Sequence, residues 1–349
     1  MRIAVDAMGG DHAPATVIEG ACCAVAAGVV TPGALILVGR AEDIEAELAK
    51  LDPVPDSQRV TLQDLQASEV PASDADRFLI VDAREVVEMD EAPAVALRQK
   101  RDSSMNVATG LVKHGIAQAL VSAGNTGAVV ASAVTQLKSL DGVHRPGIAV
   151  VIEGEAGPFV VIDVGANIAP KPMHLLHYAV MGQALMRKAH GKERPKVALL
   201  NIGGEAGKGN MLAKEAQSLI SQADINYVGN IEGQDVFLGV SDVIVTEGFV
   251  GNVVLKLSEG LAKHLLHVAH EELTRAGVDP HLVKSSLGAI LRRTDYSEYG
   301  GALLLGVEGI VTICHGRSDG RAIKNAIRLA REAVEVGINE TIVTDIKAF

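Results

Sequence analysis

The sequence contains no tryptophan, and aromatic residues account for only 3% of its 349 positions. Its formal net charge at pH 7 is −11. A nucleic-acid groove needs basic stripes and aromatic stacking platforms, and this composition supplies neither. We therefore expect no nucleic-acid partner.

Cysteine is also scarce. Cys22, Cys23 and Cys314 have the spacing of neither a metal site nor a disulfide framework, so we expect a reducing compartment. We also expect no membrane span, which would need about 20 consecutive, predominantly apolar residues in one helix. The chain begins on a strand pattern that contains Asp6, and not on a secretion signal. We expect a cytoplasmic protein without a transmembrane helix.

Glycine, in contrast, is abundant, with 36 residues, many of which follow apolar, strand-like runs. These runs lie near residues 2–7, 34–39, 59–62, 117–122, 148–152, 159–164, 196–201, 243–246 and 310–314. They alternate with helical patterns, which is typical of a wound α/β sheet that binds ligands beyond the carboxyl ends of its strands. Glycine lets the backbone present free N–H groups there, which favours a phosphate or an oxyanion.

The pattern predicts one α/β unit over residues 1–349, and it leaves open a division into two lobes with the site in the cleft between them. Residues 252–293 break the alternation of strands and helices. Helical stretches at 252–276 and 280–292 flank a turn there. They predict an inserted helical hairpin that projects from the sheet.

The loop Gly203-Gly-Glu-Ala-Gly-Lys-Gly-Asn210 follows a strand and precedes a helix over residues 211–220, as a P-loop would. A Walker motif needs glycine at position 202 and Ser or Thr at position 209, where this chain has Ile202 and Gly209. Nucleotide hydrolysis is therefore disfavoured. Lys208 is either a point charge for a phosphate or carboxylate, or a solvated lysine in a flexible loop.

Two further loops offer hydrogen-bond donors without bulky side chains. Ser122-Ala-Gly-Asn-Thr-Gly127 precedes a helix over residues 128–137, and Asn125 or Thr126 is alternatively its N-cap. Asp163-Val-Gly-Ala-Asn167, followed by Lys171, combines an acceptor, an amide and a cation. Its alternative is a loop fixed by an Asx turn.

Histidine clusters and the Cys314-His315 pair carry less weight. His264, His267 and His270 recur at helical spacing without a Cys or Asp partner, so a solvated helix face is expected there and a metal site is not. Neighbours on a strand point to opposite faces, which disfavours a nucleophile and base pair at Cys314-His315.

Together the motifs resemble those of the bacterial phosphate acyltransferase family over essentially the whole chain. The matching blocks are Asp6-Ala-Met-Gly-Gly-Asp11 with Ala13-Pro14, Ser122-Ala-Gly-Asn-Thr-Gly-Ala128, Asp163-Val-Gly-Ala-Asn167, Leu199-Leu-Asn-Ile-Gly203 with Lys208-Gly209, Gly248-Phe-Val-Gly-Asn-Val-Val-Leu-Lys256 and Asp295-Tyr-Ser-Glu-Tyr-Gly-Gly301. The resemblance implies an acyltransferase that moves a fatty acyl group from an acyl carrier protein thioester to inorganic phosphate. The product would be acyl phosphate for phosphatidic acid synthesis.

The same resemblance implies a three-layer Rossmann-like sandwich, related to phosphotransacetylases and to isocitrate and isopropylmalate dehydrogenases. It also implies a homodimer without a redox cofactor. The hairpin would attach the protein peripherally to the inner face of the cell membrane, where a membrane glycerol-3-phosphate acyltransferase would be a partner. The sequence departs from the family's usual pattern at Gly115-Ile-Ala-Gln-Ala119, at Glu247, and ahead of residue 295, where only Lys284, Arg292 and Arg293 are basic.

The predicted mechanism is direct attack of phosphate on the thioester carbonyl, without a covalent enzyme intermediate. The catalytic candidates are Asp6, Asp163, Asn167, Lys171, Asn201 and Lys208. The phosphate-binding candidates are Ser122, Gly124, Asn125, Thr126, Gly127, Gly209 and Asn210, and the substrate-binding candidates are Gly9, Gly10, Asp11, Gly248 and Asn252. The membrane-contact candidates, which alternatively form a dimer core, are Leu261, Leu265, Val268, Leu287, Ile290 and Leu291.

Other functions stay open. One alternative is a phosphotransacetylase-like enzyme that uses acyl-CoA, and another is a non-catalytic scaffold for lipid enzymes. A dehydrogenase is less favoured, because no Gly-x-Gly-x-x-Gly follows the first strand and no paired aspartates suggest a metal.

Overall fold

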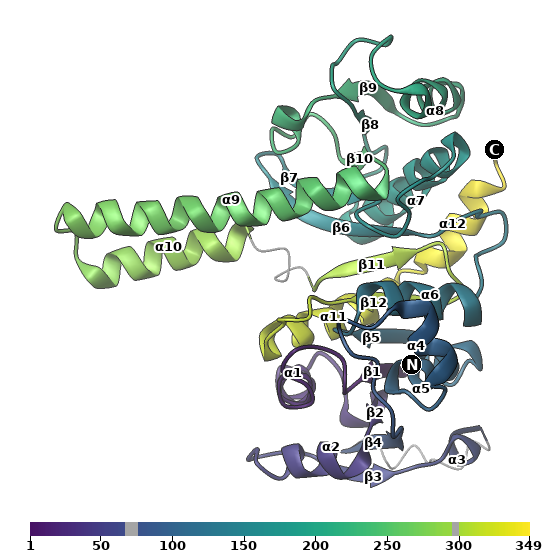
Figure 1. Cartoon of the computed structure of the whole chain (residues 1–349), viewed down its shortest axis with the longest axis vertical. Helices are drawn as coiled ribbons and strands as arrows, with labels where there is room; N and C mark the ends of the chain where they lie inside the picture. Colours follow the sequence, from purple (N-terminus) through teal and green to yellow (C-terminus); the bar gives the residue numbers. More distant parts are fainter. Residues whose placement is uncertain (67–75, 295–299) are drawn as a thin grey trace. The chain divides into compact units, whose positions relative to one another are not determined.

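The computed structural model describes residues 1–66, 76–294 and 300–349, which divide into two compact units (Figure 1). Unit 1 covers residues 1–146 and 300–348. Unit 2 covers residues 147–299 and includes the terminal Phe349.

Unit 1 alternates strands and helices. Its strands are β1 (Ile3–Asp6), β2 (Leu35–Gly39), β3 (Asp56–Arg59), β4 (Arg77–Asp82), β5 (Ala119–Ser122), β11 (Ala302–Leu305) and β12 (Ile310–Ile313). Its helices are α1 (Ala15–Ala26), α2 (Ala41–Leu48), α3 (Leu62–Gln66), α4 (Pro93–Gln99), α5 (Ser104–Lys113), α6 (Thr126–Gln136), α11 (Gly320–Glu335) and α12 (Ile338–Ile346), with a short 3₁₀ turn at Pro32–Ala34.

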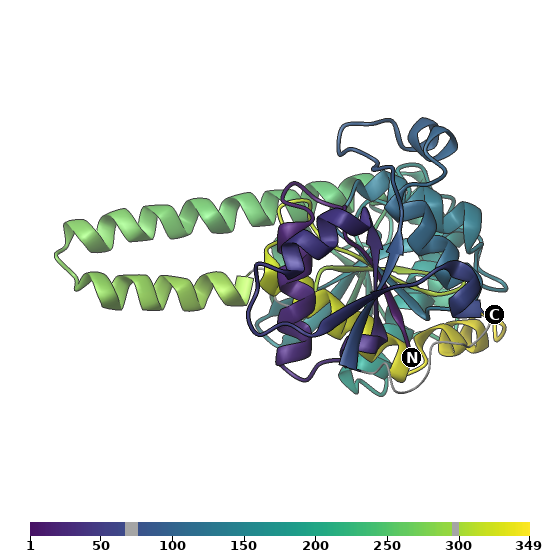
Figure 2. The same ribbon diagram turned by 90° about the horizontal axis from the view of Figure 1, so that it is seen from below.

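The strands of unit 1 lie in the order β3-β4-β2-β1-β5-β12-β11, parallel except for the antiparallel β11–β12 pair. Every residue of β1, β2 and β5 is buried, because helices cover both faces of the sheet. Helices α1 and α11 pack together, and α11 packs onto β5 and β12. Helix α5 contacts β1, β2 and β5 from the other face (Figures 1 and 2).

Unit 2 contains the strands β6 (Gly147–Gly154), β7 (Gly157–Ile162), β8 (Val197–Leu200), β9 (Tyr227–Ile231) and β10 (Val243–Val245). Its helices are α7 (Pro172–His190), α8 (Met211–Gln222), α9 (Gly248–Arg275) and α10 (Pro280–Thr294), with a 3₁₀ turn at Gly233–Asp235. The strand order is β6-β7-β10-β8-β9, parallel apart from the β6–β7 hairpin. Helix α7 packs closely on β10, and the glycine at position 182 permits this approach: a Cβ atom there would lie only 2.5 Å from the Val243 side chain.

Helices α9 and α10 form the hairpin. They pack along each other and extend away from the rest of unit 2 (Figure 2). None of the helices in the described ranges combines the length and hydropathy that a bilayer crossing needs.

The predicted α/β class and the hairpin are confirmed, with differences in detail. The strand predicted at 59–62 is wrong: β3 ends at Arg59, and residues 62–66 form α3. Strands β4, β9 and β11 were not predicted. Helix α9 begins at Gly248, four residues before the predicted start at residue 252, because Glu247 caps it.

Candidate functional site

In unit 1, the carboxyl ends of the neighbouring strands β1, β5 and β12 carry the first group of predicted residues. Ser122 Oγ donates a 2.7 Å hydrogen bond to Asp6 Oδ2 and accepts one of 3.1 Å from the N–H of Gly124. Burial raises the pKa of Asp6, and the Ser104 and Ser122 hydroxyls only partly offset this effect. Asp6 and Ser122 are both buried, so this pair holds the strand tips together and does not reach solvent.

The Gly9-Gly10 turn fits closely between these strand tips. A Cβ atom at Gly9 would lie 2.7 Å from both Asp6 Oδ2 and the nitrogen of Gly124. Gly10 has φ +111°, which L side chains rarely adopt. The next residue, Asp11, donates its N–H to the Gly316 carbonyl at 2.7 Å, which ties the β1 loop to the β12 loop.

Asn125 is the N-cap of α6, as one of the two sequence interpretations has it. Its Oδ1 accepts from the N–H of Ala128 at 3.1 Å, while its Nδ2 donates to the carbonyls of Met89 and Glu91 at 2.9 and 3.1 Å. Both polar groups of the Asn125 side chain are therefore hydrogen-bonded within unit 1. The N–H groups of Thr126 and Gly127 have no hydrogen-bond partner among the described residues, and they remain available to an anion.

In unit 2, Asp163 organises the loop after β7. Its Oδ1 accepts three backbone N–H groups, from Ile148, Gly165 and Ala166, at 2.8–3.0 Å. Its Oδ2 accepts from the N–H of Asn167 at 2.7 Å. Burial raises the pKa of Asp163, and these four N–H groups counter the shift. Asp163 thus fixes the 163–167 loop, as the Asx-turn interpretation expects.

The first turn of α9 packs directly on this loop. Gly248 donates its N–H to the Asn167 carbonyl at 2.9 Å. A Cβ atom at Gly248 would lie 2.5 Å from that oxygen, and one at Gly251 would overlap the Asp163 carbonyl oxygen. Asn252, one residue further, is exposed and borders Gly165.

The N-terminus of α9 is not an anion site. Glu247 accepts hydrogen bonds from the N–H groups of Phe249 and Val250 at 2.8 and 3.0 Å. Its carboxylate therefore already occupies the positive end of the helix.

The loop between β8 and α8 carries the remaining predicted residues. Asn201 Nδ2 donates to the Lys208 carbonyl at 3.2 Å, and Gly209 has φ +92° and packs on the Asn201 side chain. Asn210 caps α8 by accepting from the N–H of Ala213 at 2.9 Å. The side chain of Lys208 is exposed and has no ion-pair partner within the described part of the chain, and the same is true of Lys171, the N-cap of α7.

The structure therefore groups the predicted residues by unit. Unit 1 holds Asp6, Gly9, Gly10, Asp11, Ser122, Gly124, Asn125, Thr126 and Gly127. Unit 2 holds Asp163, Asn167, Lys171, Asn201, Lys208, Gly209, Asn210, Gly248 and Asn252. The single pocket expected in a cleft between lobes stays a prediction.

Sequence reasoning missed the structural roles of Glu247, Gly251 and Gly316. The Gly-x-x-Gly spacing of residues 248 and 251 is a signal for close packing at the start of a helix, and Glu247 stands one residue before it. The Gly316 contact carried no such local signal, because it joins segments that are distant in the sequence. The final motif falls largely on residues 295–299, which lie outside the described residues.

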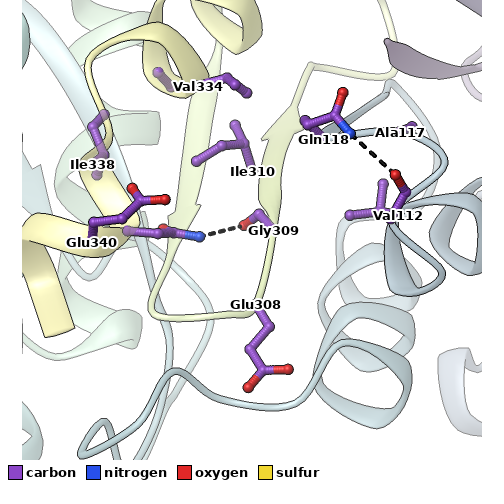
Figure 3. A pocket seen from close by; sticks show the side chains of 12 residues that line it. Val112, Ala117, Gln118, Glu308, Gly309, Ile310, Val334, Ile338 and Glu340 are labelled. Carbon is purple, nitrogen blue, oxygen red and sulfur yellow. Dashed lines mark hydrogen bonds between the residues drawn. The ribbon is translucent and has the colours of Figure 1, made fainter. Parts of the chain in front are cut away.

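A cavity of about 260 Å³ in unit 1 lies at the opposite end of the strands, where β5 and β12 begin (Figure 3). The Gln118 amide there donates to the Gly115 carbonyl, and the Asn339 amide donates to that of Gly309. None of the predicted site residues lines this cavity. No group of three or more His, Cys, Asp or Glu side chains able to hold a metal lies among the described residues.

The hairpin residues differ in exposure. Leu261 and Leu265 are 53% and 57% exposed, and Val268 is 38% exposed. On α10, Ile290 and Leu291 are exposed, whereas Leu287 is half-buried. Apolar side chains do lie on the hairpin surface, but Leu287 also takes part in its packing.

Comparison with known proteins gives relatives over the full length. A family model described as "Fatty acid synthesis protein" matches residues 1–341. The chain is 45% identical over 338 residues to a phosphate acyltransferase of Heliobacterium modesticaldum, covering 96% of this chain and 94% of the relative. It is 46% identical over 353 residues to a phosphate acyltransferase of Desulfitobacterium hafniense, covering 100% and 98%.

Solved structures with the same fold include a phosphotransacetylase from Streptococcus pyogenes, with a TM-score of 0.59, 18% identity, and coverage of 96% of this chain and 94% of the other. A branched-chain phosphotransacylase from Enterococcus faecalis has a TM-score of 0.55, 16% identity, and coverage of 96% and 99%. At these identities the likeness shows the Rossmann-like α/β fold.

Proposed function

Because the chain belongs to the phosphate acyltransferase family, we propose that it transfers a fatty acyl group from an acyl carrier protein thioester to inorganic phosphate. The product is acyl phosphate for phosphatidic acid synthesis. The full-length similarity to relatives named phosphate acyltransferase is the observation that carries this proposal.

Phosphate is the nucleophile in the proposed reaction. One of its oxygens forms a bond to the thioester carbonyl carbon, the C–S bond breaks, and the carrier leaves with a free thiol. The absence of a suitable protein nucleophile at the described strand tips supports direct attack. Burial raises the pKa of Cys314 to about 12, and Ser122 is fully buried with its hydroxyl bonded to Asp6.

Two sets of donors suit phosphate. In unit 2, the exposed ammonium of Lys208 stands just before the capped N-terminus of α8, where the helix dipole favours anions. In unit 1, the N–H groups of Thr126 and Gly127 remain open at the start of α6. Amide donors with few cations hold phosphate without a strong ion pair, which keeps it reactive.

The other candidates then act by positioning. Asp6 fixes Ser122 and Gly124, and Asp163 fixes the 163–167 loop. Holding two reactants in line contributes about 7–11 kcal/mol to catalysis, and each preorganised donor to the developing oxyanion about 3–4 kcal/mol. We assign Lys171 as the donor to that oxyanion. Its side chain is exposed, and it follows the 163–167 loop in the sequence.

The hairpin supports peripheral membrane association. Val268, Ile290 and Leu291 place apolar surface on α9 and α10, and such a surface can enter the headgroup boundary. Peripheral association fits an enzyme that takes acyl chains from a soluble carrier in the cytoplasm and passes the product to a membrane glycerol-3-phosphate acyltransferase. A homodimer formed through the hairpin is the competing use of the same surface.

The test measures thiol release from palmitoyl acyl carrier protein and from palmitoyl-CoA, each with and without phosphate, while hydroxylamine traps acyl phosphate. The proposal expects thiol release that depends on phosphate, an equal amount of acyl phosphate, and higher kcat/KM with the carrier protein. A preference for palmitoyl-CoA supports the phosphotransacetylase-like alternative. No thiol release from either donor supports the scaffold.

A further inference from the structure

An apolar groove of about 230 Å³ lies in unit 2 between α9, the end of β6 and the segment around Phe237. Its lining residues are Ile152, Glu153, Phe237, Leu255, Ser258, Glu259, Leu261, Ala262 and Leu265. Leu255 is a buried part of the lining, with 8% exposure, whereas Leu265 at the other end is 57% exposed.

The wall opposite α9 is held in place. The Phe237 ring packs edge-to-face on Phe159 with a centroid separation of 5.9 Å, and the Phe237 carbonyl accepts the N–H of Glu155 at 3.0 Å. Phe159 is buried in β7. The groove therefore has a fixed aromatic wall and does not depend on a mobile side chain.

The groove and the 163–167 loop lie along one face of α9. Gly248 and Gly251 contact the loop, and Leu255, Ala262 and Leu265 continue the same stripe at intervals of three, four or seven residues. At 1.5 Å per residue, Leu255 lies about 6 Å and Leu265 about 21 Å along the helix from Gly251.

We propose that this groove holds the fatty acyl chain of the substrate, with the thioester beside the 163–167 loop and the chain running along α9 from Leu255 toward Leu265. This inference rests on the proposed function, because it assigns the acyl part of that substrate. The apolar lining and the open far end match a chain that is anchored at the loop.

The polar rim of the groove carries Glu153 and Glu259, and Lys256 pairs with Glu259 at 3.3 Å. The hydrocarbon part of an acyl thioester is uncharged, so it passes this rim without adding a charge to it.

The geometry predicts which chain lengths use the groove. An extended chain advances about 1.2 Å per bond, since three backbone bonds of a polypeptide span about 3.6 Å. A butyryl group ends before Leu255, whereas a palmitoyl group reaches about as far as Leu265. Groove variants should therefore act on palmitoyl and spare butyryl substrates.

The experiment compares Ala262→Phe, which fills the groove, with Leu257→Phe, which adds a ring on the exposed side of the same helix, where Leu257 is 66% exposed. We expect Ala262→Phe to lower kcat/KM for palmitoyl acyl carrier protein at least tenfold and to leave butyryl acyl carrier protein within twofold. Leu257→Phe should leave both unchanged. Equal losses on the two substrates, or no loss on either, would overturn the inference.

A binding measurement works without turnover. Because the chain has no tryptophan, Phe237→Trp places a single fluorophore in the groove wall, and Leu257→Trp places one outside it. In phosphate-free buffer, palmitoyl acyl carrier protein should shift the emission of Phe237→Trp but not of Leu257→Trp, and butyryl acyl carrier protein should shift neither. Equal responses of the two variants to the palmitoyl carrier, or no response, contradict the inference.

The two experiments separate the two proposals. A wild-type protein that makes acyl phosphate while both groove measurements fail retains the proposed function and loses the acyl groove. A wild-type protein that makes no acyl phosphate loses the proposed function, and the fluorescence result alone then decides the groove. Ala262→Phe could instead keep its palmitoyl turnover and float less with vesicles, or dimerise more weakly. That result would assign the groove to a membrane or dimer surface and would overturn the inference.

Discussion

Gly251 lies directly against the main-chain oxygen of Asp163, and no side chain fits between them. This contact joins the hairpin helix α9 to the loop that Asp163 fixes. The hairpin helix and the 163–167 loop are therefore joined by a direct main-chain contact.

A substitution at this junction should damage both stability and activity. Gly251→Ala forces a Cβ atom into the Asp163 carbonyl and should lower the free energy of unfolding by about 1–3 kcal/mol, as overpacking does. Gly260→Ala is the matched control, because it lies in the same helix with nothing within 4 Å, and it should stabilise by up to about 1 kcal/mol. Urea unfolding measures both variants. Equal effects would contradict the contact.

Asp6 gives a prediction about pH. Its pKa is raised in the folded protein, so its contribution to stability is complete below the unfolded pKa of about 3.9 and is lost as the pH rises through the folded pKa. Asp6→Asn keeps an acceptor for the Ser122 hydroxyl and does not titrate. The free energy of unfolding of the wild type relative to Asp6→Asn should therefore fall from pH 4 upward, by up to about 1.4 kcal/mol per pH unit.

Urea unfolding of both proteins at pH 4, 5.5 and 7 measures this difference, since the other carboxylates titrate in both and cancel. A difference that stays constant over the range, or that grows with pH, would show that burial does not raise the pKa of Asp6.

Lys208 should contribute to the binding of phosphate and contribute little to the binding of the acyl donor. Lys208→Ala should raise KM for phosphate about 10- to 100-fold, since a hydrogen bond to a charged group is worth about 1.5–3 kcal/mol. KM for the acyl donor should change less than twofold. Lys263→Ala, an exposed lysine on the hairpin, is the control. An unchanged phosphate KM in Lys208→Ala assigns this lysine to a solvated loop.

The membrane role of the hairpin is testable at Val268, which lies beyond the lining of the groove. Val268→Glu should lower flotation with anionic vesicles about tenfold, because it places a charge on the apolar face. Val228→Glu on β9 has a similar starting exposure, 45% against 38%, and should have no effect. Light scattering checks the oligomeric state, and unchanged flotation of a Val268→Glu protein with the wild-type oligomeric state rejects the membrane role of this position.

Most strands whose apolar runs end in a small or polar residue and glycine were predictable from the sequence, but the buried strand β11, which Gly306 follows, was missed. Strands at the sheet edges, where burial is partial, were also missed or misplaced. Strand β3 is the polar segment Asp56–Arg59, held at the sheet edge by pairing with β4, so no hydrophobic pattern marks it. Strand β9 is also at an edge and contains Gly229. Strand β4, in contrast, is not at an edge and has an apolar run at Arg77–Asp82 that fits the strand pattern, although it was not predicted.

The candidate site was predictable in composition and not in detail. Motif spacing identified the loops after β1, β5, β7 and β8. It included the Asx turn of Asp163, but it could not show that the Asn125 amide is used by the carbonyls of Met89 and Glu91, or that Asp163 also accepts the N–H of Ile148 on the neighbouring strand. These roles depend on contacts between segments far apart in the chain, which local patterns do not encode.

Direct attack by phosphate is the central claim, and a single-turnover experiment tests it most directly. Enzyme in excess over palmitoyl acyl carrier protein is quenched over time, first without phosphate and then after phosphate is added. We predict no thiol release before phosphate, and then equal amounts of thiol and acyl phosphate. One equivalent of thiol per bound substrate in phosphate-free buffer would reveal an acyl-enzyme and contradict the account.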